Sequence, residues 1–175
     1  MNVLFTIAIT TGLLSGIWGW IAITLGLIGW AGFLGYAAGF ASPISGFRGF
    51  LITALTCCSG VFWGEMIKTG SALRPEWSIL GYVVIGLVGF AMCMQSTYQW
   101  LAFLPGTFIG ASAALASPQN WQTVIVSLLL GLIFAYAMKL SGMWLLHKQQ
   151  ALSEARLKAK TPPVAYSVVS GSEGS

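Results

Sequence analysis

The chain contains no aspartate, and its 175 residues include only four glutamates, eight lysines or arginines and one histidine. Charged residues make up 7% of the chain and apolar residues 57%, whereas a soluble domain carries about 25% charged residues. So little charge excludes a water-soluble globule. It also leaves too few acids and imidazoles for the paired carboxylates, acid–base couples or metal clusters of enzymes. We therefore expect a membrane protein that is not an enzyme and holds no cofactor or metal.

Cysteine is also scarce. Cys57, Cys58 and Cys93 all lie in apolar runs, are odd in number and lack the spacing of a zinc or thioredoxin-like site. We expect them to be inert buried thiols, because free cysteine behaves as a small apolar residue. No lysine or arginine precedes the first apolar run, as a signal peptide requires. This run is therefore interpreted as an uncleaved first span.

Long apolar runs occupy most of the chain. Residues 3–42 carry no charge, and one helix of that length would measure about 60 Å, twice the hydrocarbon thickness. Two spans of about 20 residues fit instead, with a reversal within 21–29. The remaining runs predict further spans at about 49–67, 79–94, 100–116 and 121–146. The predicted fold is all-α, a polytopic transmembrane helical bundle of about six spans; five spans with one re-entrant segment is the alternative.

The polar interval 68–77 separates two halves of similar length. We expect a transmembrane domain over residues 1–147, with halves at about 1–70 and 75–147. A basic helical extension is expected at 148–161, and a disordered tail rich in serine and glycine at 162–175. The basic residues after the last span predict a cytoplasmic C-terminus and a multi-pass topology. Their charge suits anionic lipid headgroups rather than nucleic acid.

Part of the first half recurs in the second. When residues 33–43 are aligned with 108–118, six of the eleven pairs are identical, including both Ala-Ser-Pro turns. Three spans per half is an odd number, so the second half would enter the bilayer from the opposite side. The sequence therefore predicts a 3+3 inverted repeat, an arrangement in which interrupted helices mark a transport site.

Pro105 and Gly106 are expected to break the fifth span. Proline removes a backbone donor and frees a carbonyl, which must then face protein or a water-filled cavity. We therefore predict a pathway at the repeat interface, with an aromatic constriction formed by Trp30 opposite this break. The predicted lining residues are Trp30, Phe33, Pro105, Gly106, Thr107, Gly110 and Ser112. Close helix packing is the alternative interpretation of the glycines spaced four residues apart.

Glu65 is the acid expected to lie within a span. An intramembrane carboxylate is a candidate proton or cation site. Lys68 follows three residues later on the same helical face, so an ordinary interfacial ion pair is the alternative.

Several segments resemble a known family. They are Gly16-Ile17-Trp18-Gly19-Trp20, Trp30-Ala31-Gly32-Phe33-Leu34-Gly35, Leu104-Pro105-Gly106-Thr107-Phe108-Ile109-Gly110-Ala111 and Gly131-Leu132-Ile133-Phe134 with Tyr136-Ala137-Met138-Lys139. Together they resemble the YcdZ-type bacterial inner-membrane proteins over most of residues 1–147. This family is a domain of unknown function. The resemblance implies an inner-membrane location and supplies no catalytic residues.

Two classes of function are compatible with these features. The first is a small channel or facilitated-diffusion transporter for a small neutral or weakly charged solute, since few buried charges are present for ion coupling. The second is a membrane-embedded interaction or assembly protein without transport activity. In both cases the partners are the lipid bilayer and further copies of the chain, because six spans in so few residues leave a thin protomer. No nucleic-acid partner is expected.

Overall fold

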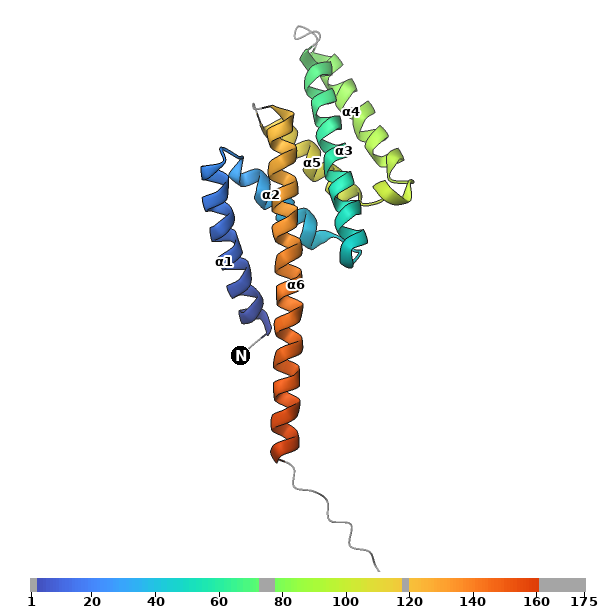
Figure 1. Cartoon of the computed structure of the whole chain (residues 1–175). Helices are drawn as coiled ribbons and strands as arrows, with labels where there is room; N and C mark the ends of the chain where they lie inside the picture. The colour runs from blue at the N-terminus through green and yellow to red at the C-terminus, as the bar shows by residue number, and fades with distance from the viewer. Residues whose placement is uncertain (1–2, 73–77, 118–119, 161–175) are drawn as a thin grey trace, which may run out of the picture.

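The computed structural model describes residues 3–72, 78–117 and 120–160, and every regular element in these ranges is helical. The all-α class is therefore confirmed. A turn of 3-10 helix, η1 (Gln99–Leu101), precedes α5. The α-helices are α1 (Val3–Thr24), α2 (Gly29–Ala41), α3 (Gly46–Ala72), α4 (Ser78–Gln95), α5 (Leu104–Ala116) and α6 (Trp121–Lys160). Figure 1 shows α1 and α3 running in the opposite direction to α4 and α6.

The helices differ strongly in length. By length and composition, α3 and the Trp121–Trp144 part of α6 suffice to cross a membrane, and shorter apolar helices occur at Ala8–Thr24, Gly81–Gln95 and Leu104–Ala116. The short helices α2 and α5 have 13 residues each, a length of about 20 Å against a hydrocarbon core of about 30 Å. They are therefore too short to cross it alone. The α2 segment is shorter than the expected span of about 20 residues.

The first reversal is where the sequence predicts it. Helix α1 ends at Thr24, α2 begins at Gly29, and Gly26 between them has a φ of 65°. Only glycine adopts this left-handed conformation without a steric cost.

The interruption at Pro105 differs from the expectation. Helix α5 begins at Leu104, which makes Pro105 its second residue. Proline is favourable in a first turn, because its missing N–H has no partner within the helix there and its φ is already helical. The prediction that Pro105 breaks a continuous fifth span is therefore wrong, since this residue begins a short helix.

Helix α6 continues without interruption to Lys160. The expected extension at 148–161 is thus helical as far as residue 160. Residues 68–72 of the polar interval between the halves belong to α3. The rest of that interval, 73–77, and the expected disordered tail at 162–175 lie outside the described residues.

The starts of the helices repeat at a constant spacing. Helices α4, α5 and α6 begin 75 positions after α1, α2 and α3, respectively, and α5 ends 75 positions after α2. The buried positions of the two short helices repeat at the same spacing. They are Ala31, Gly32, Gly35, Tyr36, Ala38 and Gly39 in α2, and Gly106, Thr107, Gly110, Ala111, Ala113 and Ala114 in α5.

Each of the two short helices packs mainly on the long helix of the other half. The most extensive contacts are between α3 and α5 and between α2 and α6, followed by α1 with α6 and α3 with α4. These contacts are close: a Cβ added to Gly110 would overlap the carbonyl of Cys57 on α3, and one added to Gly35 would overlap the carbonyl of Leu128 on α6. Glycine thus allows both helix pairs to approach at backbone distance.

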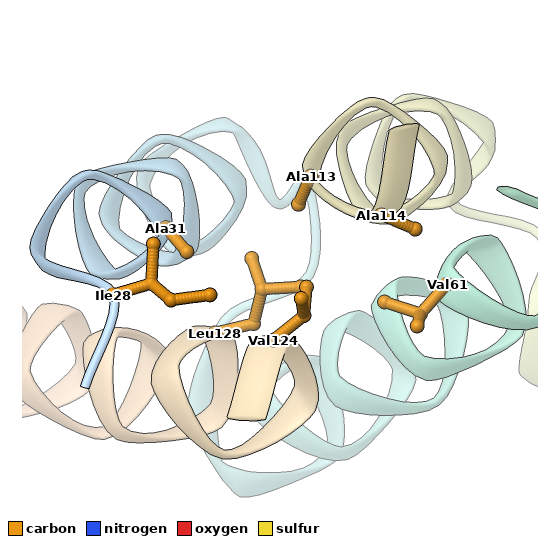
Figure 2. Close-up of a cluster of buried hydrophobic side chains, with 7 residues drawn as sticks. All are labelled: Ile28, Ala31, Val61, Ala113, Ala114, Val124 and Leu128. Carbon is orange, nitrogen blue, oxygen red and sulfur yellow. The ribbon is translucent and has the colours of Figure 1, made fainter. Parts of the chain in front are cut away.

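The centre of the molecule lies where the four helices α2, α3, α5 and α6 meet (Figure 2). Small side chains from the short helices face branched side chains of the long helices. The cluster consists of Ile28, Ala31, Val61, Ala113, Ala114, Val124 and Leu128. This apolar core holds α2 and α5 in fixed positions between the long helices.

Candidate functional site

A polar cluster joins the three helices α3, α4 and α5 around Gln95, the last residue of α4. The Gln95 side-chain oxygen accepts hydrogen bonds from the Ser59 hydroxyl and the Trp63 indole N–H, both at 2.8 Å. Its amide nitrogen donates to the Thr107 hydroxyl at 3.1 Å. Because an indole N–H can only donate, it fixes which end of the amide faces α3. We call these four residues the Gln95 cluster.

The sequence predicted one member of the Gln95 cluster and missed three. Thr107 was a candidate, and it is fully buried on α5. Gln95 was assigned to a short polar connection at 95–99, and Ser59 and Trp63 to an ordinary span. One signal could have identified them: several side chains with hydrogen-bonding groups lie in apolar segments. Such groups are unfavourable in lipid unless they form hydrogen bonds with one another.

The matching place in the first half is filled by Trp18. Its fully buried indole packs against Gly32, where an added Cβ would overlap the ring, and its N–H donates to the Gly29 carbonyl at 3.0 Å. The ring also meets Tyr36 and Phe134 edge to face, with centroid distances of 6.4 and 5.9 Å. We call Trp18, Tyr36 and Phe134 the Trp18 cluster.

The two clusters occupy corresponding positions in the two halves. Gly32 and Thr107 are 75 positions apart, and Phe134 follows Trp63 by 71. The spacing of 71 is four residues, or about one helical turn, shorter than the spacing of 75 between the helix starts. The residues of α6 that contact α2 therefore lie one turn nearer to the N-terminus of α6 than the helix starts alone would place them. Trp18 thus contacts in the first half the position that Gln95 contacts in the second, although the residue 75 positions before Gln95 is Trp20.

The sequence-predicted pathway residues fall on two kinds of face. Gly106, Thr107 and Gly110 are buried and face α3. The other four are exposed in the protomer: Trp30 (44%) and Phe33 (53%) on α2, and Pro105 and Ser112 on α5. The structure thus brings three of the seven together on one face of α5 and leaves the others on outward faces.

Glu65 forms an ion pair with Lys68 at 2.5 Å, and both side chains are 32% exposed. Lys68 also donates to the carbonyl of Ser117, just after the end of α5, at 3.5 Å. The ammonium therefore contacts both a carboxylate and a carbonyl at a helix C-terminus, where positive charge is favourable.

The chemistry available in the Gln95 cluster is that of neutral hydrogen bonding. Its amide, two hydroxyls and indole supply both donors and acceptors without a charge. Within residues 3–72, 78–117 and 120–160, no group of three His, Cys, Asp or Glu side chains is placed to hold a metal ion. The cluster suits contacts with a small neutral polar molecule.

Comparisons with known proteins place the chain in a family. The family model described as "Protein of unknown function (DUF1097)" matches residues 8–143. The protein named Inner membrane protein YcdZ of Escherichia coli strain K12 is 58% identical over 145 residues, covering 83% of this chain and 89% of that protein. The protein of the same name in Salmonella typhimurium strain LT2 is 55% identical over 150 residues, covering 86% and 94%.

A more distant relative is the Uncharacterized protein YahC of Escherichia coli strain K12. It is 28% identical over 173 residues, which cover 90% of this chain and 98% of that protein. No solved structure matches the chain. The resemblance to YcdZ-type proteins is thus confirmed, and the names of these two relatives support the expected inner-membrane protein. The chain belongs to the family of proteins of unknown function described as DUF1097.

Proposed function

We propose that the protein is a multi-pass inner-membrane permeation protein that passes a small neutral or weakly charged solute through two inverted halves. The observation that carries the proposal is the pair of 13-residue helices, α2 and α5, whose bounds and buried positions both repeat at a spacing of 75. Paired short or interrupted helices in corresponding places of two halves are typical of transport sites. The basic C-terminal part of α6 would face the cytoplasm.

The contact pattern supports an inverted repeat of three helices per half. In the repeat, α5 is the equivalent of α2, and α6 is the equivalent of α3. The contact of α2 with α6 therefore has as its equivalent the contact of α5 with α3, and these are the two most extensive contacts in the molecule. The contact of α1 with α6 likewise has as its equivalent the contact of α4 with α3. A two-fold relation between the halves produces such exchanged pairs, whereas independent packing of two domains does not.

The Gln95 cluster is the proposed solute site. A neutral solute that carries both a donor and an acceptor can replace the bonds of Gln95 to Thr107 and Ser59 one by one. The first turn of α5 lies next to this cluster, because Pro105 and Gly106 directly precede Thr107. Passage requires α5 to separate from α3, since Gly106, Thr107 and Gly110 are closely packed against that helix. The described arrangement is thus a closed state.

The tight packing also favours a second candidate, an assembly protein without transport activity. Backbone-to-backbone contacts at Gly60 and Gly110 make the interface of α3 and α5 solid. A rigid interface of this kind is expected of a structural partner, which has no need to open.

In both cases we propose a homo-oligomer. Within the described residues, nothing from elsewhere in the protomer lies within 4 Å of a Cβ added to Gly12, Gly16 or Gly19 on α1, or to Gly86 or Gly89 on α4. Small residues on a lipid-facing helix allow a second helix to approach closely. A monomer in both mild detergent and lipid nanodiscs would contradict this proposal.

Reconstituted vesicles test the permeation proposal. Swelling of proteoliposomes would be followed by stopped-flow light scattering with glycerol, urea and acetamide for the native protein, Thr107→Trp and Gln95→Leu. We expect at least one solute to enter faster than into empty vesicles, and both variants to slow it. Phe108→Trp is the matched control, because it introduces the same indole side chain at a neighbouring position that is 46% exposed.

Permeability equal to that of empty vesicles for every solute would favour the assembly protein. Equal slowing by Phe108→Trp and Thr107→Trp would reject the Gln95 cluster as the site. Gel filtration of each variant before reconstitution separates loss of function from loss of fold.

A further inference from the structure

Lys139 of α6 lines a cavity of about 380 Å³ that is distinct from the Gln95 cluster. The cavity lies between the C-terminal end of α2, the connection from α2 to α3, the first turns of α3, and α6. Its lining is mainly apolar and includes Phe40, Ile44, Phe50 and Leu132. The volume is within the range of about 300–1,000 Å³ that is usual for small-molecule sites.

Lys139 is the counterpart of Lys68. The two lysines are 71 positions apart, the same spacing that relates the packing of α3 and α6. Each donates to a carbonyl at the C-terminal end of a short helix: Lys139 to Gly39 of α2 at 2.6 Å, and Lys68 to Ser117 after α5 at 3.5 Å. The repeat therefore places one ammonium at the end of each short helix.

The two lysines differ in their counterions. Lys68 is paired with Glu65, whereas the position 71 residues after Glu65 is Tyr136, a neutral phenol that lines the cavity. Among the described residues, no acid forms an ion pair with Lys139. The end of the α2 dipole offsets only about half a charge. Positive charge therefore remains beside an apolar cavity.

The depth of Lys139 indicates what neutralises this charge. It lies 18 residues after the start of α6 at Trp121, about 27 Å along the helix. The hydrocarbon core is about 30 Å thick, so the ammonium lies near the headgroup level where α6 leaves the membrane. A cation at this depth next to an apolar cavity is complementary to a headgroup phosphate with an acyl chain attached.

We infer that this cavity binds one anionic phospholipid. The phosphate is held by the Lys139 ammonium, which has donors left after its bond to Gly39, and by the phenol O–H of Tyr136. One acyl chain lies along the apolar lining. The lipid thus supplies the negative charge that Glu65 supplies in the other half.

Lipid retention on the purified full chain tests this inference. The protein in detergent is titrated with phosphatidylglycerol or with phosphatidylcholine of the same acyl chains, and bound lipid is counted by native mass spectrometry. We expect phosphatidylglycerol to be retained at least about fivefold more strongly, as one basic contact predicts. Lys139→Gln and Tyr136→Glu should each abolish this preference, the second by supplying a built-in carboxylate three residues before the lysine.

The matched control is Lys148→Gln, which removes an exposed lysine of the same helix that lies over the Trp144 ring and should leave retention unchanged. Equal retention of the two lipids, or unchanged retention in both Lys139→Gln and Tyr136→Glu, would overturn the inference. Displacement by inorganic phosphate at the same concentration would also overturn it, because the acyl chain would then contribute nothing. Tyr136→Glu keeps the test decisive if Lys139→Gln does not fold.

Discussion

The two halves of this protein have matching short helices but differ in what fills the space beside them. In the first half the fully buried Trp18 ring covers Gly32 of α2. In the second half the Gln95 amide binds Thr107 of α5. The backbone arrangement is thus maintained by small residues on the helix contacts, whereas the side chains of the neighbouring clusters are free to differ. The first half thus has a buried aromatic ring at this place, and the second has the hydrogen-bonding groups of the proposed solute site.

Of the changes that test this comparison, replacing Trp18 should reduce stability most. Trp18→Ala leaves a large cavity in the first half and should reduce stability by about 3–5 kcal/mol. The apparent Tm in detergent measures this loss. Trp20→Ala is the control, because Trp20 is 69% exposed and should tolerate the change. Equal Tm values for the two variants would show that the Trp18 cluster is not a rigid support.

Valine at the glycine contacts should have the next largest effect, and a similar one in both halves. Gly35→Val and Gly110→Val each force a side chain into the backbone of the facing long helix, and each should cost about 3 kcal/mol. Gly86→Val is the control, since no neighbour in the described part of the chain lies within 4 Å of a Cβ added there. A large loss in one half and none in the other, measured by Tm, would contradict matching helix contacts.

Gln95→Leu should have a moderate effect on stability. It leaves the Ser59 and Trp63 donors without their acceptor, at a cost of about 1–3 kcal/mol. The Tm should therefore fall less than in Trp18→Ala, although both positions occupy corresponding places. Gln99→Leu, at an exposed residue of η1, controls for the change in polarity. A larger fall in Tm in Gln95→Leu than in Trp18→Ala would mean that the second half, and not the first, contains the cluster more important for stability.

Tyr36→Phe should have the smallest effect, and with the opposite sign. The Tyr36 hydroxyl is buried without a hydrogen-bond partner among the described residues, which is an unfavourable state for a polar group. Its removal should leave stability unchanged or raise it by about 1 kcal/mol. A clear fall in Tm would mean that this hydroxyl has a partner in the assembled protein.

Much of the fold could be predicted from the sequence. The reversal near Gly26, the helix starts that follow the Ala-Ser-Pro turns, and the repeat spacing of 75 all depend on local signals: backbone freedom at glycine, proline, and apolar run length. The shortness of α2 was not predicted, because apolar composition does not distinguish a helix that crosses the bilayer from one buried among other helices.

The candidate site was predicted only in part. Thr107 was identified through its position after Pro105, but Gln95, Ser59 and Trp63 come together only through the packing of α3, α4 and α5. The burial of Trp18 likewise depends on the close approach of Gly32. Contacts between distant segments of this kind carry no local sequence pattern.

The most direct test of the inverted halves is the side of the membrane on which two equivalent residues lie. Ser45, before α3, and Asn120, before α6, are both exposed and 75 positions apart. Each would be changed to cysteine in a chain whose three native cysteines are replaced by alanine, and labelled in cells with a membrane-impermeant maleimide. The account predicts that Asn120→Cys is labelled from outside and Ser45→Cys only after the inner membrane is permeabilised. Labelling of both from the same side would contradict it.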